Sequence, residues 1–460
     1  MKTDSSPAGR MVYVSFLAGV AAVGGFLFGF DTAVISGALS PLIQYFGLAS
    51  QPALQGWLVS SVVLGCVLGA LFSGHAADRF GRKSMLIWAG VFFLMSSIGS
   101  AIAGTFFTFI VFRLMAGVAV GIAAMVSPLY IAEVAPVAIR GRMVALNQFA
   151  LTIGILVAYL SNDYIGKMLS GESALTGNLL AGVEIWRIML ATATLPSLLF
   201  LILLVFVPES PRFLLLKNCD AAAFGTLRKL NGPERAQEEM EFIRNALRRN
   251  TVSIRDLVRP PLRTTTFIAL YLAVVSQLSG IDLVLHYGPL ILERSGLSFG
   301  DSLSGQLTFG VVLVVFTLLA MWKVDTLGRR PLLFIGNTGI LCSLVMIGYF
   351  FTNTAFSETG LLIAISCFVA CFAFSMGPIP WIVMSEIFPA KIRGQAMALA
   401  TFSLFGANWV IAQLFPISME HLGESLTFWL LALITIPTFF FIWKVLPETK
   451  GKALEAQPIN

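Results

Sequence analysis

The chain has 460 residues, of which 57% are hydrophobic and only 12% are charged, and its formal net charge is +6. A soluble chain carries about twice that share of charged residues, so the composition excludes an ordinary soluble protein and indicates an integral membrane protein. A basic balance also suits nucleic-acid binding, but no nucleic-acid motif accompanies the charge, and we expect no nucleic-acid partner.

Twelve apolar segments are long enough to cross a bilayer as helices. In chain order they cover residues 12–37, 54–74, 84–103, 106–129, 143–163, 186–207, 264–290, 304–324, 331–351, 360–384, 396–416 and 424–446. The sequence therefore predicts an all-α membrane protein with twelve transmembrane helices in a lipid bilayer.

The first apolar segment contains one carboxylate, Asp31, in the middle of the stretch FLFGFDTAVISG (26–37). An ionised acid at bilayer depth costs roughly 2.5–3.5 kcal/mol on insertion scales. Ionisable residues at that depth mark functional sites, so Asp31 is the first candidate functional residue.

The positive charges predict the orientation of the chain. Of the 30 Lys and Arg residues, all but Arg113, Lys167, Arg187 and Arg294 lie in the termini or in the loops that follow even-numbered segments. Cytoplasmic loops carry such an excess, so we expect both termini to be cytoplasmic in a multi-pass protein of a plasma membrane, the inner membrane of a bacterium. We expect the first segment to act as the insertion signal, with no removable signal peptide.

Three short motifs occur twice, in the same order and at nearly constant spacing. DRFGR (78–82) returns as DTLGR (325–329), EVAPVAIRG (133–141) as EIFPAKIRG (386–394), and PESPR (208–212) as PETKG (447–451). Each motif alone is an ordinary charged turn, but three together indicate a duplicated six-helix unit. Two such units, related by a pseudo-twofold axis, enclose a cavity near the middle of the bilayer.

The repeat predicts five parts of the chain: a cytoplasmic tail (1–11), an N-terminal six-helix bundle (12–207), a linker (208–263), a C-terminal six-helix bundle (264–446) and a second cytoplasmic tail (447–460). The linker contains the charged stretch ERAQEEMEFIRNALRRN (234–250), which has helical spacing. We therefore expect short amphipathic helices on the cytoplasmic face.

The paired motifs place acids and bases at the cytoplasmic helix ends of both halves. They are Asp78, Arg82, Glu133, Arg140, Glu209, Asp325, Arg329, Glu386, Arg393 and Glu448. Carboxylates favour helix N-termini and pair with cations, so the set can hold the two halves together on one side. Alternatively, some of the arginines only fix the topology.

Together these stretches resemble the sugar porter family of the major facilitator superfamily, and are most similar to bacterial proton-coupled sugar symporters of the xylose/proton type. The resemblance rests on GFLFGFDTAVISGAL (25–39), DRFGRK (78–83), RLMAGVAVG (113–121), SPLYIAEVAPVAIRGR (127–142), NQFALTIG (147–154), PESPRFLL (208–215), VDTLGRRP (324–331), GPIPWIVMSEIFPAKIRG (377–394) and PETKG (447–451). It implies the major facilitator fold and a secondary active transporter that imports a sugar or polyol as a monomer, without a cofactor.

The resemblance also implies a substrate site between the halves. It places Phe28, Gln148, Gln277, Trp381 and Asn408 at positions that contact or line the sugar. Amide groups donate to and accept from hydroxyls, and an indole offers a flat apolar face with one donor. Read without the family, a Gln in a membrane helix can equally hold helices together.

Asp31 matches the acid of proton-coupled sugar porters, and Arg113 matches the partner of that acid. Burial favours the neutral form of a carboxyl group, whereas a nearby guanidinium favours the charged form. A shift of the bundle could therefore switch Asp31 between the two forms. The alternative is a static ion pair that only joins two helices.

Several positions depart from the family pattern, mostly in SQLSGIDLVLHY (276–287). Ser276 replaces a Gln, Asp282 an Asn and His286 a Tyr. Leu313, Leu404 and Phe405 replace polar or larger residues of the site, and Ala193 replaces an acid. We expect Asp282 to face the substrate, His286 to lie near the outer gate, and Gly280 to loosen the helix before them. The pair would then select a modified sugar or polyol, unless Asp282 accepts one hydroxyl much as Asn would.

Three functional classes remain to be compared. A proton-coupled transporter is the main prediction; a proton-independent facilitator and a transporter-like nutrient sensor are the alternatives, although the short C-terminal tail disfavours a sensor. We expect no enzyme and no metal site, because the sequence has neither a nucleotide-binding glycine loop nor a His/Cys metal-ligand spacing.

Overall fold

The computed structural model describes residues 7–136, 139–168, 183–248, 257, 259–260, 262–352, 358–388 and 392–448. These residues form helices joined by turns, without a strand in the described ranges. Twelve helical stretches are long and apolar enough to cross a membrane, which confirms the predicted fold class. Arg393, one of the predicted charged residues, has a side chain outside the described part, as does Asp325.

The N-terminal half consists of α1 (Pro7–Tyr45), α2 (Pro52–Phe80), α3 (Arg82–Ile102), α4 (Phe106–Val134), α5 (Arg140–Lys167), α6 (Ile185–Ala191) and α7 (Thr194–Val205). The linker helices are α8 (Pro211–Leu216), α9 (Asp220–Asn231) and α10 (Pro233–Arg248). The C-terminal half consists of α11 (Arg263–Leu278), α12 (Ile281–Arg294), α13 (Phe299–Leu327), α14 (Arg329–Thr352), α15 (Glu358–Phe374), α16 (Ile379–Ile387), α17 (Arg393–His421) and α18 (Glu424–Lys444).

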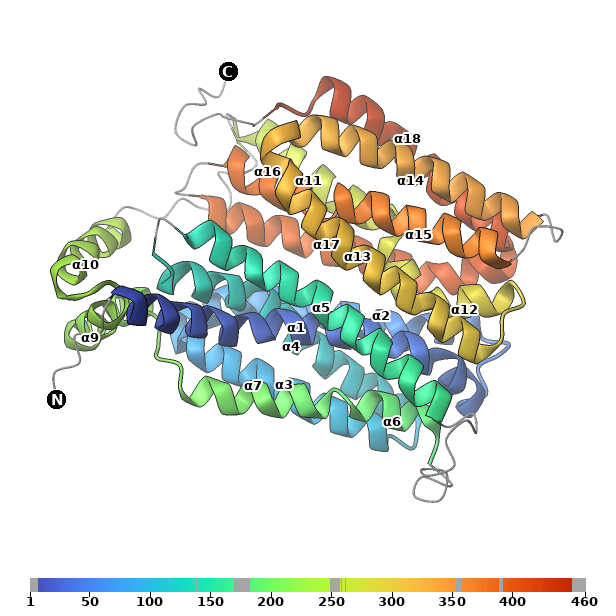
Figure 1. The fold of residues 1–460 in the computed structure, drawn as a ribbon, viewed down its shortest axis with the longest axis horizontal. Helices are drawn as coiled ribbons and strands as arrows, with labels where there is room; N and C mark the ends of the chain where they lie inside the picture. The colour runs from blue at the N-terminus through green and yellow to red at the C-terminus, as the bar shows by residue number, and fades with distance from the viewer. Residues whose placement is uncertain are drawn as a thin grey trace.

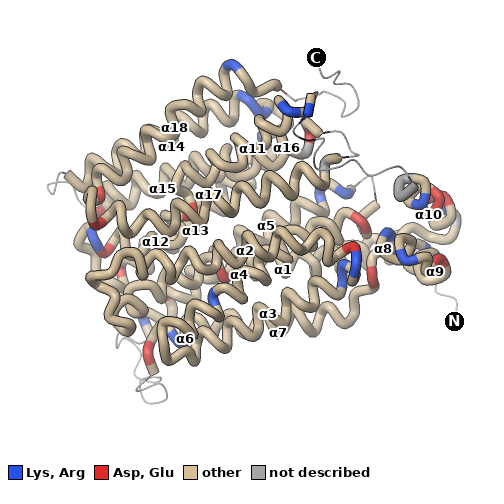
Figure 2. Tube along the Cα trace, turned by 180° about the vertical axis from the view of Figure 1, so that it is seen from behind, with Lys and Arg blue, Asp and Glu red and all other residues tan. Residues whose placement is uncertain are grey.

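The long helices of both halves run side by side, with α1 to α7 in the lower part of Figure 1 and α11 to α18 in the upper part. The helices α9 and α10 and the first turns of α1 lie at one end, on the left in that view. We call this end the motif end, because the repeated motifs of the sequence lie there, and the other end the opposite end. Figure 2 shows charged residues gathered at the two ends, with few between them.

Three of the twelve spans are broken. The span Ile185–Val205 is interrupted between α6 and α7, Arg263–Arg294 between α11 and α12, and Glu358–Met384 between α15 and α16. In the span Arg263–Arg294 the break lies at Gly280, as expected. The φ of Gly280 is +91°, a left-handed conformation that glycine adopts without strain. Irregular backbone within a membrane helix is typical of transporter sites.

The described part of the linker contains short helices with an apolar cluster of their own. Residues Leu215, Ala223, Leu227, Ala236 and Met240 of α8 to α10 form a separate buried apolar cluster. Apolar residues at these helical spacings cover one face of each helix and leave the charged face to solvent.

Close packing of α2 against α4 depends on glycines on both helices. Gly65 and Gly69 of α2 face Gly117 and Gly121 of α4, and a Cβ at Gly117 would lie 1.9 Å from the carbonyl oxygen of Val62. Small residues four apart let membrane helices approach until their backbones touch. The contact fixes the position of α4, which carries Arg113.

We expect Gly117→Ala to lower the melting temperature of the purified protein, because the added methyl group must push α2 and α4 apart. Overpacking of this kind costs about 1–3 kcal/mol. The matched control is Gly74→Ala on α2, where a Cβ would meet nothing within 4 Å and helix propensity favours Ala. Equal melting temperatures for the two variants would show that the contact is not tight.

Candidate functional site

A buried ion pair joins the middle of α1 to α4. Arg113 Nη1 donates to Asp31 Oδ1 at 3.1 Å, and the two residues are only 2% and 7% exposed. Asp31 Oδ2 and Arg113 Nε have no hydrogen-bond partner among the described residues. The structure therefore brings together the acid and the base that the sequence singled out, and leaves one carboxylate oxygen open.

A second carboxylate lies on α12, directly after the break at Gly280. The Asn408 side-chain amide of α17 donates to Asp282 Oδ2. Asp282 is partly exposed, whereas its neighbours Ile281 and Leu283 are buried. Asp282 thus keeps some accessible surface although the residues on both sides of it are buried.

His286 lies one helical turn after Asp282 and is buried. Its Nδ1 atom is 2.6 Å from the backbone carbonyl oxygen of Asp282. Since a carbonyl oxygen only accepts, Nδ1 carries the proton, and in the neutral ring Nε2 is then an acceptor.

The remaining predicted polar residues are largely unpaired. Gln277 is 8% exposed, with its Nε2 3.5 Å from Ser276 Oγ and its Oε1 atom without a partner in the described ranges. Gln148 and Trp381 are partly exposed, and neither side chain has a hydrogen-bond partner among the described residues. Unpaired polar groups in an apolar protein interior are what a hydrogen-bonding ligand can satisfy.

Aromatic and apolar residues surround these groups. The rings of Phe28 on α1 and Phe405 on α17 lie 6.2 Å apart and tilted by 54°, across the boundary between the halves. Leu313 and Leu404, which replace polar residues of the family pattern, are buried. The site therefore combines a few polar groups with an apolar wall, as small-molecule sites usually do.

The helices that carry the ion pair and the second carboxylate contact each other. The helix α1 packs against α12, and the Tyr159 hydroxyl of α5 donates to the carbonyl of Leu285 on α12 at 2.9 Å. The ion pair and Asp282 thus lie on neighbouring helices of the two halves.

The two halves contact each other through side-chain hydrogen bonds near the opposite end. Ser36 donates to Gln306 (2.9 Å), Ser40 to Glu293 (2.8 Å), Ser60 to Gln413 (2.6 Å), Gln413 to the carbonyl of Ala53 (2.8 Å), Tyr159 to the carbonyl of Leu285 (2.9 Å) and Ser304 to Asp163 (2.5 Å). These bonds close the boundary between the halves at that end. These hydrogen bonds could not be predicted from the sequence, because nothing around a Ser or Gln in an apolar helix indicates which residue it bonds.

At the motif end, the charged residues of the N-terminal half pair among themselves. Arg82 bonds Asp78 at 2.9 Å and Glu133 at 3.0 Å. Glu209 accepts from the backbone N–H of Arg82 and of Lys83 at 3.0 and 3.1 Å, which caps the N-terminus of α3. Gly81, with φ +102°, is needed there because a Cβ would lie 2.2 Å from Glu209.

The C-terminal half repeats this arrangement. Arg329 bonds Glu386 at 2.8 Å, and Glu448 accepts from the backbone N–H of Arg329 and Arg330 at 3.1 and 3.0 Å, capping α14. Gly328, with φ +90°, corresponds to Gly81. Among the described residues of the motif end, no ion pair joins the N-terminal half to the C-terminal half.

Arg140, another predicted member of this set, lies instead beside the linker. Burial raises the pKa of Glu239 on α10, and the charges of Arg140 and Arg235 oppose this rise. The linker thus contacts the helix ends of the first half electrostatically.

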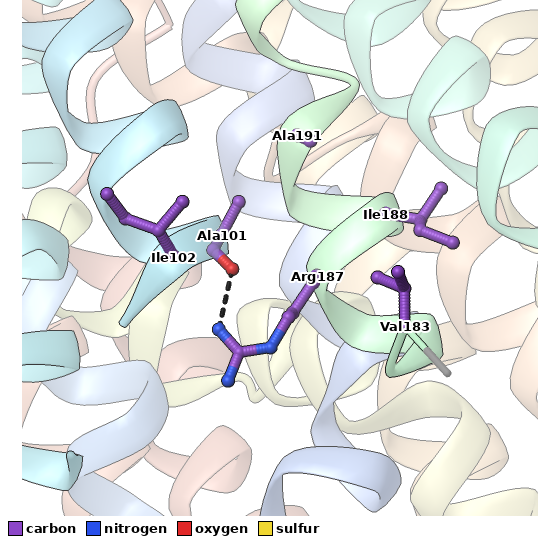
Figure 3. Close-up of a pocket in the computed structure, with 6 residues that line it drawn as sticks. All are labelled: Ala101, Ile102, Val183, Arg187, Ile188 and Ala191. Carbon is purple, nitrogen blue, oxygen red and sulfur yellow. Dashed lines mark hydrogen bonds between the residues drawn. The ribbon is translucent and has the colours of Figure 1, made fainter. Parts of the chain in front are cut away.

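A surface hollow at the opposite end lies between α3 and α6, away from the polar groups described above. It is lined by Ala101, Ile102, Val183, Arg187, Ile188 and Ala191 (Figure 3). Arg187 donates to the carbonyls of Ala101 and Ala103 and pairs with Glu184, whose pKa this hydrogen bond holds below its usual value. Because the guanidinium is already satisfied, it joins helices and offers little to a ligand.

Twelve apolar spans in two matched halves, with polar groups gathered between them, define the class: a multi-pass membrane transporter. A family model described as "Sugar (and other) transporter" matches residues 17–460, and the chain belongs to this family. The chain is 37% identical over 455 residues to an arabinose-proton symporter of Bacillus subtilis, covering 98% of this chain and 95% of the relative. It is 35% identical over 473 residues to a D-xylose-proton symporter of Escherichia coli, covering 96% and 94% of the two chains.

Solved structures agree with the fold. A partially occluded inward-open conformation of the xylose transporter XylE from E. coli matches with a TM-score of 0.84 at 34% identity, covering 96% of this chain and all of the other. The same transporter bound to 6-bromo-6-deoxy-D-glucose matches with a TM-score of 0.77, covering 97% and 98% of the two chains. The chain therefore has the major facilitator fold, and its arrangement is more similar to the inward-open structure.

Proposed function

We propose that this chain imports a sugar or polyol across a membrane by proton symport, with alternating access to a site between its two halves. The observation that carries the proposal is the buried contact between Asp31 and Arg113 inside the apolar spans. A charge placed there is expensive, and a group that takes up and releases a proton explains why it is present. The relatives named as arabinose-proton and xylose-proton symporters support the same activity.

In this proposal Asp31 holds the transported proton and Arg113 controls its release. While Arg113 donates to Asp31, the charged carboxylate is favoured; when α1 and α4 shift, desolvation favours the protonated form. The open Oδ2 atom of Asp31 is the position at which the proton would bind.

The substrate site of this proposal consists of the residues between the halves that leave polar groups or ring faces open. They are Phe28, Gln148, Gln277, Asp282, His286, Trp381 and Asn408. Their partners in the described structure are few, so hydroxyl groups of a sugar would supply the missing hydrogen bonds.

The structure represents the inward-open state in this proposal. Hydrogen bonds between the halves lie at the opposite end, which would face outward, whereas the ion pairs that the structure describes at the motif end lie within the halves. The excess of Lys and Arg supports a cytoplasmic location for the motif end and both termini. We propose that the chain consists of two tails, two six-helix bundles and a linker, with the limits derived from the repeat. We also propose that it lies in a bacterial inner membrane and functions as a monomer.

The proposal is tested with the purified chain in proteoliposomes. With an inside-alkaline pH difference, labelled D-xylose, L-arabinose, D-glucose or myo-inositol should accumulate above the outside concentration, and a protonophore should return it to equilibrium. Equilibration without accumulation would identify a facilitator. The absence of uptake for every sugar and polyol would overturn the proposal.

A further inference from the structure

The carboxylate of Asp282 has no counter-charge in the described structure. Its polar partner there is the neutral side-chain amide of Asn408, and no described Lys, Arg or His forms an ion pair with it. Asp31 differs, because Arg113 neutralises it. With Asp282 ionised, the polar groups between the halves carry a net negative charge that comes from the C-terminal half.

Besides the Asp282 carboxylate, other side chains of α11, α12 and α17 present acceptor atoms. An ionised carboxylate only accepts, so Asn408 must turn its amide nitrogen toward Asp282, which leaves Asn408 Oδ1 as an acceptor without a partner. Gln277 Oε1 is also unpartnered, and Nε2 of His286 is an acceptor for the reason given above. Asn408 and Gln277 are 5% and 8% exposed, so water satisfies these oxygens poorly.

An ionised carboxylate without a cation beside it is costly in a protein interior, as are acceptor oxygens without a partner. A hydroxyl group provides one donor and no charge. An ammonium group provides three donors, no acceptor and the missing positive charge, so it matches both the carboxylate and the acceptor oxygens.

We propose that the C-terminal half of the site binds a cationic sugar or polyol, whose ammonium group donates to Asp282. This inference rests on the proposed transport of a sugar or polyol and names the substrate class. Asp282 is the specificity-determining residue, and Asn408 positions it. An anionic sugar acid is excluded by repulsion.

The alternative role for Asp282 is a second proton site. A protonated Asp282 is neutral and donates one hydrogen bond, so it would not prefer an ammonium group to a hydroxyl group at the same ring position. Substrate preference therefore separates the two roles.

The test measures binding to the purified full-length chain in detergent at pH 6, where a sugar amine is charged because such groups titrate roughly near 7.7–8.0. D-Glucose is compared with its 2-amino-2-deoxy and 6-amino-6-deoxy forms and with N-acetyl-D-glucosamine, which is neutral. At least one amino sugar should bind about tenfold more tightly than D-glucose, because hydrogen bonds to charged groups are about twice as strong as neutral ones. N-Acetylation should remove the advantage.

Asp282→Asn should abolish the preference for the amino sugar, and Asp282→Glu should retain it. The matched control is Asp301→Asn, which removes an exposed carboxylate at the start of α13, where it bonds Ser298. This control should keep the preference of the unmodified chain. If Asp282→Asn does not fold, the test still rests on two measurements: the affinity for amino sugar relative to D-glucose in the unmodified chain, and the same ratio in Asp282→Glu.

Two results would overturn the inference: equal binding of D-glucose and both amino sugars, or an amino-sugar preference that survives in Asp282→Asn. If neutral sugars are accumulated with protons while no amino sugar is preferred, this inference fails and the transport proposal stands. If neither the neutral sugars nor the amino sugars bind, both fail.

Discussion

Replacing Asp31 by Asn is expected to abolish accumulation of substrate against its gradient, while exchange of substrate across the membrane continues. The amide has almost the shape of the carboxylate and can still accept from Arg113, but it cannot take up a proton. Accumulation driven by an imposed pH difference should therefore fall to equilibrium, and counterflow of labelled sugar should stay measurable. The two assays are made on the same proteoliposomes.

The control for this experiment must exclude loss of the folded protein, because the substitution leaves Arg113 charged and buried without its partner. Removing one member of a buried pair costs about 3–5 kcal/mol, so monodispersity and melting temperature are measured alongside. Accumulation by a folded Asp31→Asn variant would show that the transported proton binds elsewhere.

The second large effect is expected for Arg82→Ala at the motif end. Arg82 bonds Asp78, Glu133 and the carbonyl of Ala77, and its removal leaves the buried Glu133 carboxylate without this cation. Turnover should fall by at least about tenfold, which corresponds to about 1.4 kcal/mol in the barrier. The affinity of purified protein for substrate should change little, because the site between the halves is untouched.

Arg79→Ala is the matched control, since Arg79 lies on the same helix end but is exposed, with its guanidinium 5.3 Å from the ring centroid of Phe80. Transport rates and binding constants are measured for both variants. Normal turnover with collapsed affinity in Arg82→Ala would contradict a role in the conformational cycle.

Much of the architecture could be predicted because two signals extend over long stretches of sequence. Apolar runs of membrane length define the spans, and the repeated motifs define the two halves. The structure explains the motifs physically: the glycine of each D-x-x-G-R motif makes room for Glu209 or Glu448, and the arginine reaches Glu133 or Glu386. The break at Gly280 was also expected, since glycine adopts positive φ readily.

The helix ends were predicted less well. The helix α1 runs from Pro7 to Tyr45, beyond both ends of the apolar run at 12–37. Hydropathy reports where lipid contacts begin, whereas a helix continues through polar turns as long as its backbone bonds are made. The break at Thr192, between α6 and α7, has no glycine that would have predicted it. It lies four residues before Pro196, which lacks the backbone N–H that would bond the carbonyl of Thr192.

The contacts between the halves could not be predicted from sequence. Ser36 bonds the carbonyl of Ala33 in its own helix as well as Gln306 in the other half, so its presence in α1 needs no partner outside that helix. Which partner it meets depends on the relative position of two bundles. The pairing of Asp282 with Asn408 lies within the C-terminal half, but it could not be predicted either, because it joins residues of different helices that lie 126 positions apart.

The capping carboxylates Glu209 and Glu448 have a consequence for biosynthesis. Each lies at the very end of its half, yet each caps the third long helix of that half, α3 or α14. A membrane protein emerges from the ribosome from its N-terminus onward, and domains fold as units during synthesis. The first half therefore contains its capping carboxylate before the second half is made, and it can fold alone. In the second half, Glu448 is synthesised after all the membrane helices, so the N-terminus of α14 is capped only when the whole half has been made.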